Sequence, residues 1–163
     1  MSAELLRTAI DNGDVLQMAV CLEGLDDLNS RYEELEWQWP LMYAILSDSE
    51  DCVSLILNTY SLVDVNLKDT YGTTALHTAC EKQNKNIVSW LLAKDVIVDA
   101  QNKALQTPLY HACIRGNLAI AEMLLNRGAD KDIVCGRRKI TPYHASSPSI
   151  RAMMERRESF NPT

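Results

Sequence analysis

A four-residue pattern that recurs at nearly constant spacing constrains this sequence more than any other feature. Thr74-Ala75-Leu76-His77 returns as Thr107-Pro108-Leu109-Tyr110 after 33 residues and as Thr141-Pro142-Tyr143-His144 after a further 34. A degenerate copy, Trp39-Pro40-Leu41-Met42, precedes the first of these by 35 residues. Self-similarity at such a period predicts stacked units that share one core, because a single unit cannot bury its own apolar face.

The residue types within each unit predict two short helices and a projecting loop. Threonine at the head of the pattern is an N-cap, and in two copies proline follows it in the first helical turn, where a missing N–H costs nothing. Further on, Val88 and Leu91-Leu92 have the apolar spacing of a second helix. Residues 63–73 are extended and polar, so we expect them to project as a hairpin with a positive φ at Gly72.

These motifs resemble those of the ankyrin-repeat family, whose pattern is D-x-x-G-x-T-P-L-H-x-A-A followed by V-x-x-L-L-x-x-G-A-D. The resemblance covers residues 3–157 and implies an all-α fold class, an ankyrin-repeat solenoid of stacked helix-turn-helix units with projecting β-hairpin loops. It implies a single domain over 1–163, with a frayed tail at 159–163. The approximate units are 3–36 as an N-terminal cap repeat, 37–71, 72–104, 105–138, and 139–158 as a truncated C-terminal cap repeat.

The two end units depart from the repeat in ways that suit chain ends. The first predicts helices over 4–12 and 15–22 with acidic residues on its outer positions. In the last, Ser147 is interpreted as an N-cap with Pro148 after it, which predicts a final helix over 149–157. Its charged residues leave one face polar, as a terminal repeat requires.

Charge is distributed unevenly along the chain. The net charge is −6, and 47% of the 163 residues are hydrophobic, which is enough for one continuous core. Up to Asn66 there are two basic and thirteen acidic residues, and from Leu67 onward there are fourteen basic and nine acidic residues. The two parts therefore carry balances of −11 and +5, which bears on how a partner is oriented rather than on the fold.

The cysteines and the absence of targeting signals favour an intracellular protein. Five cysteines are an odd number and include no C-x-x-C pair, so neither a disulfide framework nor a zinc site is expected. Cys80 and Cys113 share one repeat position and are interpreted as core residues, whereas Cys135 is expected to be more exposed. No apolar run reaches bilayer length and no secretory signal opens the chain, so we expect a cytoplasmic or nuclear location without membrane insertion.

No pattern of residues indicates catalysis. His77 and His144 occupy the last position of the recurring motif and His111 lies one place beyond it, so hydrogen-bonding structural roles between repeats explain all three. Metal-binding histidine spacings, phosphate loops and nucleophile elbows are missing from the sequence. We therefore predict no enzyme, no cofactor and no metal site, with chemistry at Cys135 or His111 as the remaining alternative.

The resemblance implies that partners contact the hairpin tips and the exposed positions of the first helices, which together line a concave face. Carried over by register, the candidates fall on four tips and on two first helices. On the tips they are Tyr32, Glu33, Glu34, Glu36 and Trp37; Lys68, Thr70, Tyr71 and Thr73; Gln101, Lys103 and Gln106; and Arg137, Arg138 and Lys139. On the helices they are Glu81, Lys82, Ile114 and Arg115.

Three departures from the family pattern fall at or near these tips. Trp37 and Leu105 stand where turn glycines are expected, and Trp39 stands where the capping threonine is expected. Trp37 suits either a binding hot spot or packing between the first two repeats, whereas packing is favoured for Trp39. Leu105 places an apolar residue near a tip.

The predicted function is a protein–protein interaction module, an adaptor, scaffold or inhibitor that binds a protein partner or peptide and is a monomer on its own. The basic cluster 137–139 suits an acidic peptide, a phosphoprotein or nucleic acid, or is only a solvated tip, and an acidic chain with one such cluster disfavours nucleic acid. The alternative is a recognition domain of a larger channel, kinase, ubiquitin-ligase or pathogen effector protein. Asn66 also matches the type of hairpin asparagine that is hydroxylated in some members of the family.

Overall fold

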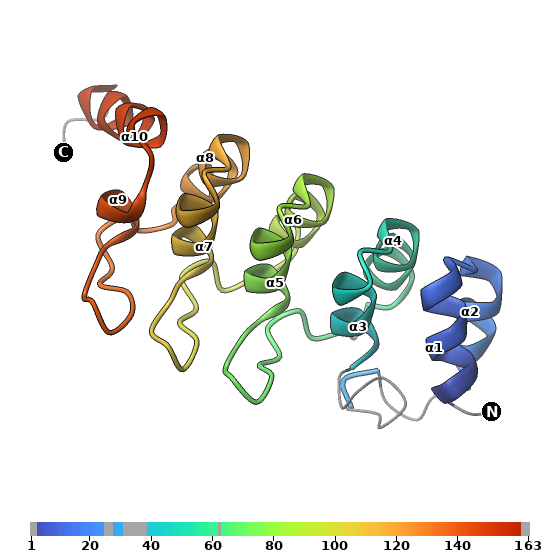
Figure 1. The fold of residues 1–163 in the computed structure, drawn as a ribbon. Coiled ribbons are helices and arrows are strands. Elements are labelled where there is room, and N and C mark those ends of the chain that lie inside the picture. The colour runs from blue at the N-terminus through green and yellow to red at the C-terminus, as the bar shows by residue number, and fades with distance from the viewer. Residues whose placement is uncertain (1–2, 25–27, 31–38, 62, 161–163) are drawn as a thin grey trace.

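The helices stack in pairs along one axis, and loops project from one edge of the row (Figure 1). The computed structural model describes residues 3–24, 28–30, 39–61 and 63–160. Within those residues there are ten helices. They are α1 (Ala3–Asn12), α2 (Val15–Glu23), α3 (Pro40–Leu46), α4 (Glu50–Thr59), α5 (Ala75–Lys82), α6 (Lys85–Leu92), α7 (Pro108–Arg115), α8 (Leu118–Asn126), α9 (Pro142–Ala145) and α10 (Pro148–Phe160). This confirms the all-α solenoid expected from the repeat.

The first helix of each inner unit begins where the recurring motif predicts. The Thr107 hydroxyl accepts a hydrogen bond from the backbone N–H of Tyr110 at 3.2 Å, and proline occupies the next position. Thr141 caps α9 in the same way, through the N–H of His144 at 3.4 Å. Each cap satisfies an N–H that the first turn leaves without an intrahelical partner, which fixes where the helix starts.

The second helices have caps of their own. The side-chain oxygen of Asn84 accepts from the N–H of Ile87 at 3.0 Å, and Asn117 accepts from the N–H of Ile120 at 3.1 Å. One left-handed residue, Gln83 or Gly116, separates each asparagine from the preceding helix, so each short polar break becomes a sharp reversal. The two helices of a unit are thereby placed side by side.

One apolar core runs through the stack. The motif leucine and the following alanine of the third unit, Leu76 and Ala79, are buried, and so is Leu91 on the second helix. Trp39 is only 2% exposed and belongs to this core, which confirms that it packs rather than projects. In α8, Ile120, Ala121 and Leu124 are fully buried, as are the matching residues of α6, whereas Leu125 is only half-buried.

The projecting loops are tight turns with little β-structure. Their backbones close through hydrogen bonds from Asp69 to Thr73, from Asn102 to Gln106, and between Cys135 and Ile140 in both directions. Among the described residues, Cys135 and Ile140 form the one isolated antiparallel β-bridge. Gly72 has the positive φ expected of it, at 75°.

The last unit is a short helix followed by a longer one. The final helix, α10, runs to Phe160, three residues beyond the expected end, and the hydroxyl of Ser147 accepts from the N–H of Ile150 at 3.4 Å, as expected of an N-cap. None of the helices in the described part of the chain has the length and apolar character needed to cross a membrane.

Candidate interaction surface

Three hairpin tips lie next to one another and are joined by backbone hydrogen bonds. We call them the Tyr71 tip (residues 69–73), the Leu105 tip (residues 102–106) and the Arg137 tip (residues 135–140), and together the tip surface. The N–H of Lys103 donates to the carbonyl of Tyr71 at 2.8 Å, and the N–H of Gly136 donates to the carbonyl of Leu105 at 3.2 Å. A Cβ at Gly72 would lie 3.1 Å from the backbone nitrogen of Lys103, so a larger residue would have to displace the Leu105 tip by a few tenths of an ångström. The tips thus form one continuous surface.

A pocket of about 510 Å³ opens between these tips. Its apolar walls come from Tyr71, Ala104 and Leu105, and its polar rim includes Lys103 and Arg137. Tyr71 is 74% exposed and Leu105 is 54% exposed. Exposed apolar side chains also occur elsewhere on the described surface, for example Leu16 at 83%, but Tyr71 and Leu105 line one pocket together, which marks it as a candidate contact point.

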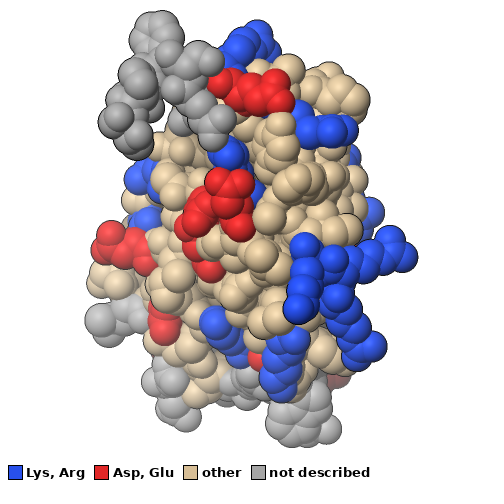
Figure 2. Space-filling view, turned by 90° about the vertical axis from the view of Figure 1, so that its left-hand side faces the viewer, with Lys and Arg blue, Asp and Glu red and all other residues tan. Residues whose placement is uncertain are grey.

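Positive charge gathers on the same surface. Lys103, Arg137, Arg138 and Lys139 are all exposed, and none of them forms an ion pair with another described residue. Figure 2 views the molecule from the C-terminal end of the stack and shows Lys and Arg side chains gathered toward the lower right. The hairpin tips lie along the lower edge of the molecule in Figure 1. The one acidic residue of the Tyr71 tip, Asp69, accepts hydrogen bonds from two N–H groups of its own turn, at 2.7 and 2.8 Å.

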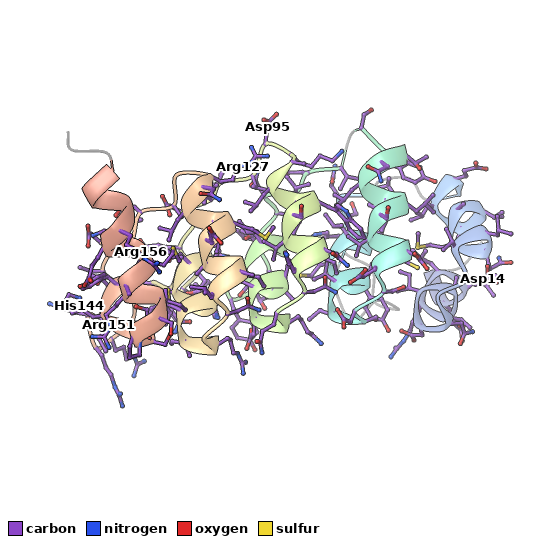
Figure 3. All side chains as sticks on the ribbon, turned by 90° about the horizontal axis from the view of Figure 1, so that it is seen from above. Asp14, Asp95, Arg127, His144, Arg151 and Arg156 are labelled. Carbon is purple, nitrogen blue, oxygen red and sulfur yellow. The ribbon has the colours of Figure 1, made fainter. Side chains whose placement is uncertain are left out.

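The two ends of the stack differ in charge as the sequence predicts. Figure 3 shows Asp14 at one end of the row and Arg151, Arg156 and His144 at the other. The carboxylate of Asp14 accepts from the N–H of Gln17 at 2.9 Å and so caps α2. A partner that lies along the row therefore meets a graded potential, which favours one orientation over the other.

The candidates on the first helices lie in register with each other. Glu81 on α5 and Arg115 on α7 form an ion pair at 3.1 Å, so each is already partnered across the repeat boundary. Lys82 is exposed, and Ile114 is 55% exposed. Ile114 is therefore the apolar member of this group that remains open to a partner.

Several tip candidates serve the hairpins themselves. The Gln101 amide donates to the carbonyls of Leu105 and Val134, both at 3.2 Å. The N–H of Thr73 donates to Asp69, and the carbonyl of Gln106 lies 2.9 Å from the His77 ring. Their side chains or backbone groups stabilise the tips, which leaves Thr70 and Tyr71 as the freer residues of the Tyr71 tip. Lys68 is exposed, and its ammonium group donates to the carbonyl of Gln101 at 3.3 Å.

The candidates of the first tip, Tyr32, Glu33, Glu34, Glu36 and Trp37, lie outside the described residues. The structure instead draws attention to Leu105, which the sequence interpretation noted but did not include among the contact residues. Leu105 has a φ of 58°, in the left-handed region where its counterpart Gly72 has 75°. The signal was present in the sequence, since a leucine replaces the expected turn glycine.

His77 links two neighbouring units. Its Nδ1 accepts from the N–H of Thr74 at 3.2 Å, which places the ring proton on Nε2, and Nε2 then donates to the carbonyl of Gln106 at 2.9 Å. Burial lowers the pKa of His77 to about 4, so the ring is neutral at physiological pH. This is the structural role expected of it.

His111 differs from that expectation in one respect. Its ring meets the His77 ring edge-on, with centroids 5.8 Å apart, but its Nε2 makes no hydrogen bond to any described residue. Burial lowers the pKa of His111 as well. No group of three or more histidine, cysteine or acidic side chains in the described part of the chain is arranged to hold a metal ion.

The expectation that Cys135 is exposed is wrong, because the thiol is completely buried. Cys135 holds the hairpin position of Asp69 and Asn102, whose side chains turn inward to accept N–H groups of their own turns. The Cys135 thiol likewise points inward, with its sulfur 3.4 Å from the carbonyl oxygen of Ile133. Cys80 and Cys113 are buried as expected, and burial raises the pKa of both, that of Cys113 to about 12. These two thiols stay protonated and unreactive at neutral pH.

A family model for ankyrin repeats in three copies matches residues 41–135. The chain belongs to the ankyrin-repeat family. Its relatives include a tyrosine-protein kinase of Hydra vulgaris, 35% identical over 130 residues that make up 77% of this chain and 15% of the kinase. The ankyrin repeat and KH domain-containing protein mask-1 of Caenorhabditis elegans is 42% identical over 107 residues, 66% of this chain and 4% of that protein. Inversin of Gallus gallus is 33% identical over 92 residues, 56% of this chain and 8% of inversin. The chain therefore spans a small part of the length of these relatives.

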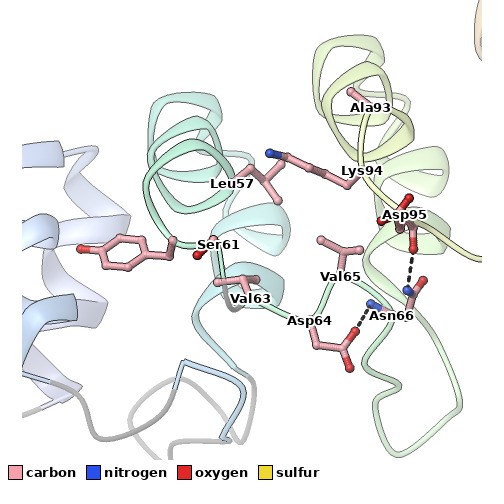
Figure 4. A pocket seen from close by; sticks show the side chains of 10 residues that line it. Leu57, Ser61, Val63, Asp64, Val65, Asn66, Ala93, Lys94 and Asp95 are labelled. Carbon is pink, nitrogen blue, oxygen red and sulfur yellow. Dashed lines mark hydrogen bonds between the residues drawn. The ribbon is translucent and has the colours of Figure 1, made fainter.

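A second pocket, of about 360 Å³, lies between the second and third ankyrin repeats, where the second helices of both repeats end (Figure 4). Asn66 lines it and uses both polar atoms of its side chain on the next repeat. Its amide donates to the carbonyl of Asp95 and its oxygen accepts from the N–H of Ile97, both at 2.8 Å. These bonds join the two repeats, so Asn66 has a structural role in this pocket.

Proposed function

We propose that this ankyrin-repeat domain is a protein-interaction module that binds a protein partner or peptide on the tip surface and on the exposed positions of α5 and α7. The observation that carries the proposal is the pocket between the tips, where Tyr71 and Leu105 remain exposed beside Lys103 and Arg137. Tyrosine and arginine dominate the binding energy of protein interfaces, and a rigid backbone beneath them reduces the entropy lost on binding. Repeat proteins of this kind are interaction modules without catalytic chemistry.

A protein partner fits better than nucleic acid. The chain carries a net charge of −6, and its longest run of adjacent basic residues, 137–139, is only three residues long. A monomer that presents this surface to another protein agrees with the same charge, since two like-charged copies repel each other. Five free and buried thiols support a reducing compartment, the cytoplasm or the nucleus.

Within this class the domain acts as an adaptor, a scaffold or an inhibitor. A second candidate is a recognition domain within a larger protein, and the small share of each relative that the chain spans favours it. One of those relatives is a tyrosine-protein kinase, and another relative, of Danio rerio, is named an ankyrin repeat and SOCS box protein. In either setting the binding surface is the same.

Photocrosslinking at single positions tests the proposal. A photoreactive amino acid is placed at Tyr71 or Ile114 on the proposed face, and at Leu118 or Glu122 on α8 as matched exposed controls. We expect irradiation in cells to yield discrete protein adducts from the first two positions and none from the controls. Equal adducts from both sets, or none from Tyr71 and Ile114, would overturn the assignment of this face.

A further inference from the structure

Leu105 has a left-handed backbone conformation that residues other than glycine rarely adopt. A φ of 58° brings the Cβ of an L-residue close to the following carbonyl oxygen, and glycine relieves this clash completely. The preceding ankyrin repeat has glycine, Gly72, at this place, with the same backbone hydrogen bonds inside the turn. Strained backbone positions of this kind cluster at binding and active sites, where the strained side chain serves the function.

The leucine side chain does not contribute to the core, because it is 54% exposed at the mouth of the pocket. Tyr71 of the neighbouring tip lines the same pocket and is 74% exposed. Their backbones are held in place by the bonds from Lys103 to Tyr71 and from Gly136 to Leu105. The pocket that Tyr71 and Leu105 line has a volume of about 510 Å³, which is large enough for one bulky apolar side chain of a ligand.

The groups that surround the pocket are basic. Lys103 and Arg137 line it, and Arg138 and Lys139 follow on the same tip, all exposed and none paired with a described residue. Asp69, the nearby carboxylate of the Tyr71 tip, is engaged by its own turn. The complement of this surface is therefore a ligand with negative charge on both sides of an apolar residue.

We propose that the tip surface binds an acidic peptide segment that inserts one large apolar side chain between Tyr71 and Leu105. The proposal rests on the proposed function and makes it more specific, because it names the partner's chemistry and its anchor. Glutamate and aspartate residues of the peptide pair with Lys103 and Arg137, and with Arg138 and Lys139 farther along. Arginine suits this role, since its guanidinium binds a carboxylate through two parallel hydrogen bonds.

The test begins with a display library of random linear peptides selected on the immobilised wild-type domain. We expect the enriched peptides to carry several aspartates or glutamates around one leucine, methionine, phenylalanine or tryptophan. The most enriched peptide is then labelled with fluorescein and titrated by anisotropy. Its affinity should fall when its acids are replaced by amides, when its apolar residue is replaced by serine, and when salt is raised.

Matched variants separate binding from folding. Leu105→Gly removes the side chain and relieves the strain, and we expect it to weaken peptide binding about tenfold without loss of stability. Gln83→Gly is its control, because Gln83 also has a left-handed backbone, with a φ of 61°, at the far end of α5. Arg137→Glu should weaken binding at least as much as Leu105→Gly, while Arg127→Glu, an exposed arginine away from the tips, should leave it within about twofold of wild type.

Each contrary outcome has a distinct meaning. Enrichment of neutral or basic peptides, or equal binding by wild type and Leu105→Gly, overturns the proposal. So does displacement of the peptide by an oligouridylate RNA that depends on the same residues, or wild-type dimerisation in sedimentation that Arg137→Glu abolishes. If selected peptides lose affinity in Ile114→Ser but not in Leu105→Gly, the broader function stands and only this inference fails. If no peptide binds and Tyr71 and Ile114 yield no crosslinks, both fail.

Discussion

The repeat that contains α5 and α6 and the repeat that contains α7 and α8, here the third and the fourth, share one scaffold and differ at the places where the backbone turns. Each needs one left-handed residue before its first helix and another after it. The third repeat has Gly72 before and Gln83 after, whereas the fourth has Leu105 before and Gly116 after. Glycine, the residue best suited to both places, is thus used once in each repeat and at opposite ends of the helix.

The matching positions Gly72 and Leu105 show that the turn does not depend on which of these two residues occupies it. The hairpins around Gly72 and Leu105 form the same internal bonds: the side chains of Asp69 and Asn102 each accept two N–H groups of their own turns. A leucine at the tip therefore adds nothing to the turn that glycine lacks. Its side chain contributes to the surface, while the bonds beneath it maintain the fold.

The largest difference between the two repeats should appear in their cores. Leu92 in the third repeat is 4% exposed, whereas Leu125, its counterpart in the fourth, is only half-buried. We expect Leu92→Ala to cost about 2–5 kcal/mol of unfolding free energy and Leu125→Ala less than about 2 kcal/mol, because the second leaves a smaller cavity. Urea titration of both variants measures this, and equal losses would show that α8 packs as tightly as α6.

A titratable group in the third repeat has no counterpart in the fourth. His77 is buried with its pKa lowered to about 4 by desolvation, whereas Tyr110 holds the equivalent place. Below pH 6.5 the unfolded chain takes up a proton at this histidine and the folded chain does not, so stability falls as the pH drops from 6.5 toward 4. The loss from His77 alone should reach roughly 3 kcal/mol.

Urea titrations at several pH values between 7 and 4 test this, with His77→Gln as the comparison. The variant is less stable at pH 7, because the bond to the Gln106 carbonyl is altered, but it should lose less stability on acidification than wild type. His111, whose pKa burial also lowers, contributes a loss in the same direction in both proteins. Parallel pH profiles for the two proteins would argue against the buried neutral ring.

The segments that lead from the second helices into the hairpins allow a comparison of a smaller effect. Asn66 joins the second repeat to the third through two hydrogen bonds, and Asp99 joins the third to the fourth through the N–H of Asp130, at 3.1 Å. We expect Asn66→Ala to cost roughly 1–3 kcal/mol and Asp99→Ala less, because the first leaves two backbone groups without partners. Thermal unfolding of both variants compares their stabilities. A larger loss of stability in Asp99→Ala than in Asn66→Ala would contradict this prediction.

The sequence alone predicts the helix starts and the reversals between helices, because these depend on residues close together in the chain. Threonine followed by proline sets the start of α7, and the polar break after Arg115 sets the reversal into α8, so the helices fall close to their predicted places. Trp39 could be assigned to the core from the same register. What local patterns do not encode is the contact between repeats, such as the bond from Lys103 to Tyr71 that joins two tips into one surface.

Cys135 shows where the prediction was wrong and why. Its place in a hairpin suggested exposure, yet it lies 33 residues after Asn102 and 66 after Asp69, at the position whose side chain turns inward. That position was visible in the repeat spacing, but its inward direction follows from the hydrogen bonds that Asp69 and Asn102 make. Leu105 is the opposite case. The sequence already shows that leucine replaces the expected turn glycine, but only the structure shows the pocket that this leucine lines.

The smallest expected effect is the one that most directly tests the comparison between the two repeats. Leu105→Gly and Gln83→Gly each relieve a left-handed L-residue, which stabilises the folded state by roughly 1–2 kcal/mol, and each loosens the unfolded chain, which offsets about half of that. We expect both variants to gain up to about 1 kcal/mol in urea titration, with unchanged slopes. If Leu105→Gly instead loses stability while Gln83→Gly gains it, the leucine side chain stabilises the tips, and its retention would need no ligand to explain it. If both gain equally, the leucine is held at a cost to the fold, as expected of a side chain that serves binding.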